Sequence, residues 1–248
     1  MKIISWNVNS IRARGLHVKK ILYEEKPTVL MLQETKVQDD DFPFQEFSDM
    51  DYKIFISGQK SYNGVAIFSK LDGHTENRFT KNFEEQKRFI MLENNKFIFI
   101  NVYVPNGNLI DTEKYEYKLN WFNSLNSYLK KIIKTKKMIL IGGDFNIAPF
   151  ENDIYNFNYF EKKILCTENE IKLYNDLIKI GFYDIFFEQN LHEYTWWDYR
   201  INKSNLNNGA RIDHFFCNQN KNFNVKVLKE YRLLGRPSDH APILLENI

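Results

Sequence analysis

The sequence has only two cysteines and no long apolar run, and each shortage excludes a class of protein. Cys166 and Cys217 are too few for a disulfide framework and lack the paired spacing of zinc ligands. No stretch approaches the ~20 apolar residues that span a bilayer, and the first residues lack the charged and apolar segments of a signal peptide. We therefore expect a soluble, cytoplasmic protein whose thiols stay reduced.

The chain also lacks a strong net charge and any flexible linker. Its formal charge is +2, so an attraction to nucleic acid must come from local clusters of basic residues. No repeat and no Gly/Ser/Pro-rich segment divides the 248 residues, which are enough for one large domain with a buried core. The 21 Phe and 14 Tyr residues argue against disorder, because a solvated chain could not leave that much ring surface exposed. We expect a single domain over residues 1–248.

Short apolar runs predict ten strands, and they alternate with three predicted helices. The strand candidates are 2–6, 28–32, 52–56, 65–68, 89–92, 97–104, 138–141, 211–217, 225–228 and 243–245. One helix must end before Pro27, a second covers 121–133, and a third opens at Thr167 with Glu170 in a capping-box spacing. The polar stretches 38–41 and 202–208 read as loops. This order of elements favours two sheets packed face to face with helices outside.

Polar residues follow or interrupt several of these predicted strands. They are Asn7, Glu34, Asp144, Asn146, Asp213, Asp239 and His240. A buried carboxylate costs several kcal/mol unless it is paired or coordinated, so the same pattern on separate strands indicates that the strand ends meet at one site.

Each of these polar motifs also has an ordinary structural explanation. A carboxylate such as Glu34 just past a strand is usually solvated, and Gly142-Gly143-Asp144 is usually a turn. A Ser-Asp pair before the last strand could cap a turn, with its histidine a satisfied imidazole. Asp213 is harder to explain in this way, because it lies in an aromatic strand where an unpaired carboxylate is costly. Their joint occurrence favours a functional site.

Six motifs carry a resemblance to a known family. They are WNVNSIRA at 6–13, LQETK at 32–36, GGDFNI at 142–147, WWDYR at 196–200, RID at 211–213 and PSDHAP at 237–242. The series resembles the exonuclease III family of apurinic/apyrimidinic (AP) endonucleases, within the endonuclease/exonuclease/phosphatase superfamily. The motifs follow the family order across residues 3 to 245, and the second and fourth point to its DNA-repair branch. The resemblance implies a DNase I-like fold, a four-layer α/β sandwich of two mixed sheets flanked by helices.

The resemblance also implies a hydrolase and its cofactor. Relatives incise duplex DNA 5′ to abasic sites and remove 3′ blocking groups or nucleotides through in-line attack by water. Hard carboxylate oxygens suit Mg²⁺, which Mn²⁺ can replace. By this resemblance Glu34 is the principal metal ligand, with Asp239 and Asn7 beside the ion.

The catalytic residues are assigned by the same resemblance. Asp144 orients and deprotonates the attacking water, and Asn146 donates a hydrogen bond at the reacting phosphate. His240 matches the histidine that contacts the phosphate, with Asp213 as its orienting partner. Tyr103 matches a tyrosine near the scissile bond. A carboxylate beside an imidazole favours imidazolium, which is a good donor to an oxygen that gains charge.

The resemblance also implies a surface for double-stranded DNA with abasic sites or 3′ ends. The candidate contacts are Arg12, Lys36, Lys60, Tyr62, Arg88, Asn106 and Arg200, although any single basic residue is more often simply solvated. Trp196 and Ile212 match walls of the pocket for the abasic sugar. The sequence departs from relatives in a shorter segment between residues 152 and 167, and in Ala210, where some relatives have a bulky pocket side chain.

Two other functions compete with this prediction. A lipid or inositol-phosphate phosphohydrolase would use the same metal site with a different outer surface, and the second and fourth motifs argue against it. An inert DNA-binding or scaffold protein would be expected to have lost some of the catalytic residues, which are all present. The chain also lacks the basic N-terminal extension common in eukaryotic relatives. We therefore expect a bacterial-type monomer, without a membrane partner, that is associated with the nucleoid when it acts.

Overall fold

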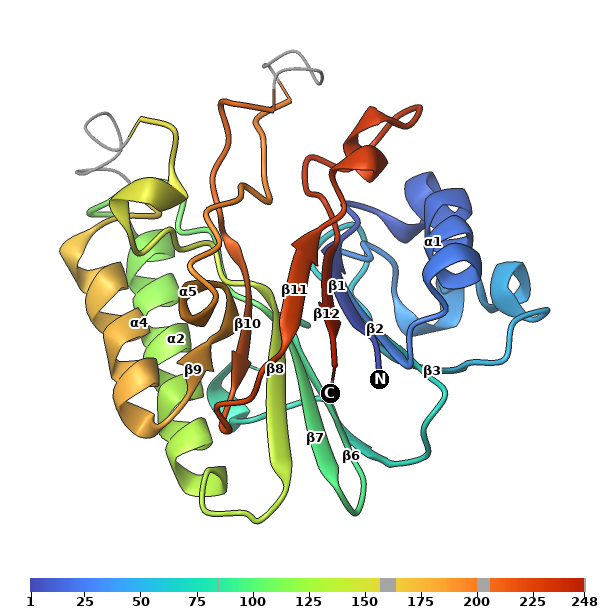
Figure 1. Ribbon diagram of the computed structural model, residues 1–248, viewed down its shortest axis with the longest axis horizontal. Coiled ribbons are helices and arrows are strands. Elements are labelled where there is room, and N and C mark those ends of the chain that lie inside the picture. The colour runs from blue at the N-terminus through green and yellow to red at the C-terminus, as the bar shows by residue number, and fades with distance from the viewer. Residues whose placement is uncertain (84, 157–163, 200–205, 248) are drawn as a thin grey trace.

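Two six-stranded sheets pack face to face, with helices on both outer faces (Figure 1). The computed structural model describes residues 1–83, 85–156, 164–199 and 206–247. The first sheet has the order β11-β12-β1-β2-β4-β3 and the second the order β5-β6-β7-β8-β10-β9. Each is mixed, because β1 pairs in parallel with β2, and β7 with β8, while the remaining pairs are antiparallel. The four-layer α/β sandwich is confirmed.

All ten predicted strands are present, and two further strands were missed. The strands are β1 Ile3–Asn7, β2 Val29–Gln33, β3 Lys53–Ser57, β4 Val65–Ser69, β5 His74–Glu76, β6 Phe89–Glu93, β7 Phe97–Tyr103, β8 Met138–Asp144, β9 Tyr183–Asp184, β10 Asp213–Cys217, β11 Asn224–Val227 and β12 Ile243–Glu246. The two missed strands, β5 and β9, lie at the edges of the second sheet. They are only three and two residues long, so neither carries an apolar run that a sequence pattern could reveal.

Within the described residues the predicted helices are present with longer bounds, together with one helix that was not predicted. The helices are α1 Ile11–Glu25, α2 Glu113–Ile132, α4 Glu168–Ile180 and the short, unpredicted α5 Ile185–Glu188. α1 ends before Pro27 as predicted, with Lys26 in a left-handed conformation. The capping box of Thr167 and Glu170 opens α4, which confirms that prediction. The stretch expected as a loop at 38–41 instead contains the 3-10 turn Asp39–Asp41.

Three apolar layers fill the spaces between sheets and helices. Met31, Phe99 and Phe215 lie in the layer between the two sheets. Trp121 of α2 and Leu177 of α4 belong to the layer outside the second sheet, and α1 packs against the first sheet in a third layer. Within the described residues, no helix is long and apolar enough to cross a membrane.

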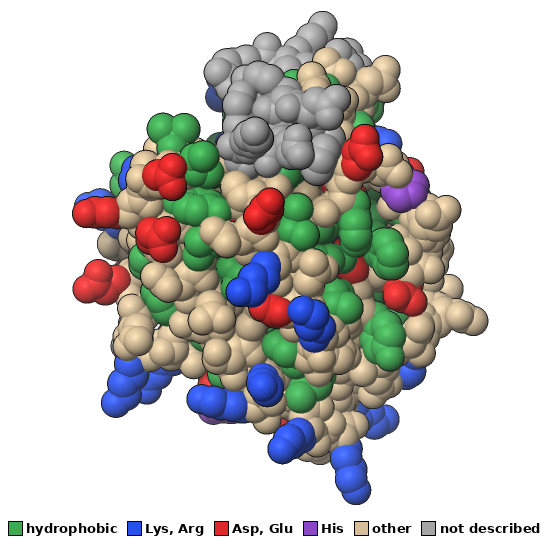
Figure 2. All heavy atoms as spheres, turned by 90° about the vertical axis from the view of Figure 1, so that its left-hand side faces the viewer, with side chains coloured by type: hydrophobic (Ala, Val, Ile, Leu, Met, Phe, Trp, Pro, Cys, Tyr) green, Lys and Arg blue, Asp and Glu red, His purple; other side chains and the backbone are tan. Residues whose placement is uncertain are grey.

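The outer face of α2 and α4 carries charges that match the helix dipoles. Figure 2 shows this face, with Lys and Arg side chains gathered mainly in its lower half. Lys130 and Lys131 lie in the last turn of α2 and Lys179 in the last turn of α4, whereas Glu113 and Glu168 lie in the first turns. Cations at helix C-termini and anions at N-termini are favourable. Lys130, Lys131 and Lys179 therefore lie where the helix dipoles favour positive charge.

The sheet topology brings the polar strand ends to one edge of the sandwich, at the top of Figure 1. The parallel pairs β1–β2 and β7–β8 end there, and the antiparallel neighbours β10 and β12 begin there. The register places Asp213 directly opposite Asp144. Asn9 and Asp239, which are 230 positions apart in the sequence, are hydrogen-bonded at this edge.

Candidate active site

Asp144 lies at the end of β8 because two glycines let that strand pass through a crowded layer. A Cβ on Gly143 would lie 2.0 Å from the Val102 carbonyl oxygen of the neighbouring strand. A Cβ on Gly142 would lie 2.7 Å from the Phe215 ring and 2.9 Å from the sulfur of Met31. Such distances exclude any side chain. The Gly-Gly pair therefore serves close packing inside β8 and is not a turn.

One side-chain amide joins the two sheets at the site. Nδ2 of Asn7, at the end of β1, donates to Oε1 of Glu34 and to Oδ2 of Asp144, at 2.9 Å each. The amide oxygen of Asn7 accepts from the backbone N–H of Asn9 at 3.0 Å. This fixes the orientation of the amide, so that its donor hydrogens face the two carboxylates. Asn7, which was predicted to lie beside the metal, is therefore at the centre of the cluster, where its amide donates to both carboxylates.

His240 is held by Asp213 and is aimed at Asp144. Its Nδ1 lies 2.8 Å from Oδ2 of Asp213, and its Nε2 lies 3.7 Å from Oδ2 of Asp144, which is beyond hydrogen-bonding distance. Burial lowers the pKa of His240, but the charges of Asp213 and Asp144 outweigh it and raise the pKa to about 10. His240 is therefore an imidazolium at neutral pH, with Nε2 facing the middle of the site.

The carboxylates of the site differ in their proton affinity. Burial raises the pKa of Asp144 to about 7, although the charge of His240 acts against this. Burial acts in the same direction on Glu34, yet the Lys36 ammonium and the hydrogen bond from Asn7 hold the pKa of Glu34 below its usual value. A carboxylate with a pKa near neutrality can take up a proton, whereas one with a lowered pKa remains an anion. Asp144 has the properties of a base, and Glu34 those of a ligand.

Asp239 is the second carboxylate that stays ionised. Burial raises its pKa, but the charge of His240 and hydrogen bonds from Asn9 and Trp196 lower it below the ordinary value. Nδ2 of Asn9 lies 3.0 Å from Oδ1 of Asp239, and Nε1 of Trp196 lies 3.1 Å from Oδ2. Trp196, predicted as a pocket wall, therefore also orients a predicted metal ligand.

Asn146 is fixed by both its backbone and its side chain. It adopts a left-handed conformation with φ 51°, and its backbone N–H donates to Oδ1 of Asp144 at 2.9 Å. Its Nδ2 donates to the Val104 carbonyl at 3.0 Å, and its Oδ1 accepts from Nδ2 of Asn106 at 2.9 Å. An amide nitrogen carries two hydrogens, so one remains to donate to an incoming oxygen.

Tyr103 closes another side of the cluster. Burial, followed by the charge of Glu34, raises the pKa of Tyr103 well above its ordinary value, and its hydroxyl hydrogen-bonds to Glu34. The guanidinium of Arg88 lies 4.4 Å from the centre of the ring. Tyr103 is therefore a neutral donor next to the acidic centre.

Two sets of residues could hold a divalent cation. The first is Glu34 with Asp239, both ionised. The Lys36 ammonium lies 2.8 Å from Oε2 of Glu34, which indicates that this position attracts positive charge. The second is Asp144, Asp213 and His240, whose ligand atoms all lie within 4.8 Å of one another. The neighbouring carboxylates raise the pKa of His240, so a cation at this second set would have to displace a proton from the imidazole. Glu34 and Asp239 offer ionised oxygens, which are the ligands that a hard cation prefers.

The predicted DNA-contacting residues divide into two groups. Lys36, Arg88 and Asn106 contact the cluster through Glu34, Tyr103 and Asn146 respectively. The other described candidates, Arg12, Lys60 and Tyr62, are exposed.

Their surroundings differ as well. Arg12 lies 3.6 Å from Oδ2 of Asp41, and Tyr62 is 70 % exposed. Lys60 and Tyr62 lie in the loop that follows β3, on the edge of the sandwich that carries the cluster. Arg200 lies outside the described residues.

The predicted pocket walls belong to one apolar cluster. Ile212 is buried in it together with Ala210 and Ile154, and half-buried Trp196 packs against it. The backbone of Ala210 bridges to both Ile154 and Trp196, so the small side chain at 210 is enclosed by its neighbours. Residues 157–163 of the shortened segment between residues 152 and 167 lie outside the described residues.

The sequence-based prediction missed Arg14 and Tyr199. Arg14 donates to the Tyr199 hydroxyl at 2.9 Å and to the Pro237 carbonyl at 3.0 Å, and Nδ2 of Asn9 also donates to that hydroxyl. The motif SIRAR at residues 10–14 contains two arginines, and the sequence analysis predicted a DNA contact only for Arg12. Only the helical phase of α1 shows that Arg14 is the one that faces the site.

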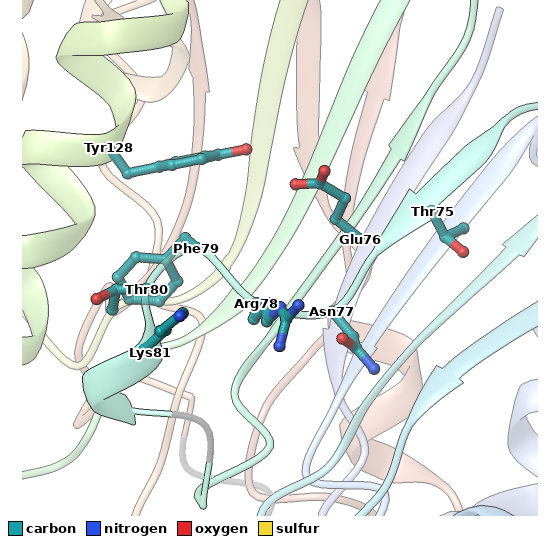
Figure 3. Close-up of a pocket in the computed structure, with 8 residues that line it drawn as sticks. All are labelled: Thr75, Glu76, Asn77, Arg78, Phe79, Thr80, Lys81 and Tyr128. Carbon is teal, nitrogen blue, oxygen red and sulfur yellow. The ribbon is translucent and has the colours of Figure 1, made fainter.

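A separate cavity of about 470 Å³ contains no member of this cluster. It is lined by residues 75–81 and Tyr128 of α2 (Figure 3). Glu76 and Arg78 place opposite charges around it. The chemistry described above therefore belongs to the strand ends and not to this cavity.

Comparisons with known proteins agree with this geometry. Residues 4–240 match the family described as Endonuclease/Exonuclease/phosphatase family. The chain is 34% identical to "Exodeoxyribonuclease III" of Haemophilus influenzae and 30% identical to "Exodeoxyribonuclease" of Bacillus subtilis, with at least 98% of each protein covered.

Solved structures agree as well. A 3′-5′ exonuclease of Neisseria meningitidis superposes with a TM-score of 0.93 at 34% identity, covering 99% of each chain. An AP endonuclease of Archaeoglobus fulgidus superposes with a TM-score of 0.93 at 32% identity, covering 99% of this chain and 98% of the other. The chain therefore belongs to the endonuclease/exonuclease/phosphatase family and, within it, to the group that contains exodeoxyribonuclease III.

Proposed function

We propose that this chain is a metal-dependent DNA repair hydrolase that incises duplex DNA 5′ to abasic sites and removes blocking groups or nucleotides from 3′ ends. The observation that carries the proposal is the Asn7 amide, which joins Glu34 to Asp144 beside the Asp213–His240 pair. A metal-binding carboxylate, a base and a cationic donor meet there, and phosphodiester hydrolysis needs all three. The names of the relatives support the same reaction.

The residues divide the chemical step among them. Asp144 takes a proton from the attacking water, since its pKa of about 7 allows proton uptake at neutral pH. The imidazolium of His240, oriented by Asp213, donates to the phosphate oxygen that gains charge. The remaining Nδ2 hydrogen of Asn146 donates to the same phosphate, and Tyr103 donates near the scissile bond. Water attacks in line, and no side chain forms a covalent intermediate.

Glu34 and Asp239, with Asn7 beside them, are the residues that would hold Mg²⁺, and Mn²⁺ would replace it. When bound, the ion neutralises charge on the non-bridging oxygens and stabilises the leaving alkoxide. Lys36 lies against Glu34, so its ammonium must move aside or share that carboxylate with the ion.

The proposed substrate is a duplex with an abasic site. Flipping out a nucleotide that has no base costs less than flipping a normal one, since no pairing and less stacking is lost. Half-buried Trp196 presents an apolar ring beside Asp239 and His240, with buried Ile212 in the cluster that this ring packs against, and the proposed site for the bare sugar lies against the ring. We expect the enzyme to act as a monomer in the cytoplasm.

The test uses a duplex with one abasic analogue. We expect cleavage 5′ to the analogue that EDTA abolishes and added Mg²⁺ restores. Asp144→Asn should lower kcat by about 1,000-fold, because it removes the base and keeps the shape. Asp72→Asn is the matched control, since the Asp72 side chain is 86 % exposed and lies away from the cluster. Wild-type activity in Asp144→Asn would contradict the assigned role, and faster turnover of a phosphoinositide than of abasic DNA would contradict the substrate.

A further inference from the structure

A buried lysine lies directly beneath the turn that carries the proposed catalytic residues. The side chain of Lys118, in α2, is 0 % exposed, and its Nζ donates to the backbone carbonyl of Asn146 at 2.7 Å. The same nitrogen pairs with Oε1 of Glu170 in α4, which is also 0 % exposed. Lys118 is not among the residues assigned to the site by sequence.

Glu170 connects this lysine to the start of α4. It is the third residue of the helix, and its Oε2 accepts from the backbone N–H and the hydroxyl of Thr167, at 2.9 Å each. Its Oε1 also accepts from the backbone N–H of Leu165 at 3.1 Å. The carboxylate is therefore fixed by three donors of its own segment, and Lys118 is anchored to a rigid point.

The turn above Lys118 is held by two buried side chains. Asn146 has a left-handed backbone, a conformation that asparagine adopts more readily than most residues with a side chain. The next carbonyl, of Ile147, lies 2.8 Å from Nε2 of buried His214, which must be the donor because a carbonyl can only accept. Two consecutive carbonyls are thus held from behind by buried side chains.

We propose that Lys118 is a positioning residue for hydrolysis. By holding the Asn146 carbonyl, it keeps the Asn146 amide pointed toward the site and the Asn146 N–H on Oδ1 of Asp144. Two apolar side chains in place of Lys118 and Glu170 would stabilise the fold about as well. The free-energy cost of desolvating a buried ion pair offsets most of the attraction between its charges. The inference rests on the proposed catalytic roles of Asp144 and Asn146.

The decisive variant is the double substitution Lys118→Met with Glu170→Gln. Lys118→Met alone leaves the buried Glu170 carboxylate unpaired, and we expect Tm to fall by about 10 °C. The double variant contains no unpaired charge, but the new amide nitrogen at position 170 must face the N–H of either Leu165 or Thr167. Tm should therefore recover only about half of the loss. The Asn146 carbonyl still lacks its donor, and kcat on abasic DNA should stay about 100-fold low, with KM unchanged.

A matched control exists on the same helix interface. Nδ2 of Asn126, two turns further along α2, donates to the Leu173 carbonyl of α4 at 2.9 Å and is far from the turn. Asn126→Ala should lower Tm and leave kcat unchanged when assayed well below Tm. Recovery of kcat together with Tm in the double variant overturns the proposal. An equal loss of kcat in double and control variants at matched Tm also overturns it. Wild-type activity in Asp144→Asn would instead refute the proposed function.

Discussion

Substitution of Asp213 by Asn tests the electrostatic centre of the site. The change keeps an oxygen that can accept from Nδ1 of His240, 2.8 Å away in the wild type, and removes only the charge. Asp213 is the largest of the influences that raise the pKa of His240 from 6.5 to about 10 against the effect of burial. An opposite charge at this distance changes a pKa by about 1 to 3, so we expect the pKa of His240 in the variant to lie near 8.

The same perturbation has a consequence for stability. The folded pKa of His240 is raised above the unfolded value of 6.5, so its contribution is complete below pH 6.5 and is lost as the pH rises toward 10. The difference between the unfolded and folded pKa of His240 corresponds to about 5 kcal/mol of stability. The charges of Asp213, Asp144 and Asp239 together supply this amount. Asp213→Asn should therefore be less stable by roughly 2 to 3 kcal/mol at pH 6. The difference should vanish near pH 10.

The assay is an NMR titration of the His240 Cε1–H resonance in EDTA, with His240→Gln to assign the signal. Urea unfolding at pH 6, 8 and 10 provides the stability of each protein. In the presence of metal, the basic limb of the kcat profile should move about two pH units lower in the variant. A His240 midpoint that stays near 10 in Asp213→Asn, or that lies below 7 in the wild type, refutes the reasoning.

Two further predictions concern the scaffold of the site. Gly143→Ala should destabilise the fold by about 3 kcal/mol, because its Cβ would lie 2.0 Å from the Val102 carbonyl oxygen. Gly235→Ala is the control, since a Cβ at that position would meet no atom within 4 Å, and it should leave thermal unfolding unchanged. Trp196→Phe keeps an aromatic ring but removes the donor to Asp239, so half-maximal activity should need about 10-fold more Mg²⁺. An unchanged Mg²⁺ requirement would show that this hydrogen bond does not orient a metal ligand.

The sequence predicted ten of the twelve strands in the described residues, the family and the polar residues at the centre of the site. Strands such as β2 and β8 are fully buried and begin with apolar side chains. Such strands can therefore be recognised in the sequence as short apolar runs. The polar residue Asn7 was conspicuous because it follows such a run, and Asp213 because it interrupts an aromatic one. Membership of the DNA-repair group is confirmed by relatives that match along the whole chain. The assigned roles of individual residues stay predictions.

Only the tertiary structure decided which atoms face one another. Lys118 shares the apolar face of α2 with Trp121 and Leu125, but only the packing of α4 shows that its ammonium is buried against Glu170 and the Asn146 carbonyl. Arg14 and Arg12 look equivalent until the helix phase separates them. The periodicity of apolar residues along the sequence indicates which side chains are buried. A hydrogen bond such as that from Lys118 to Asn146, 28 positions apart, depends instead on how the sheets and helices pack. The burial and the charges that raise the pKa of Asp144 arise from that packing alone.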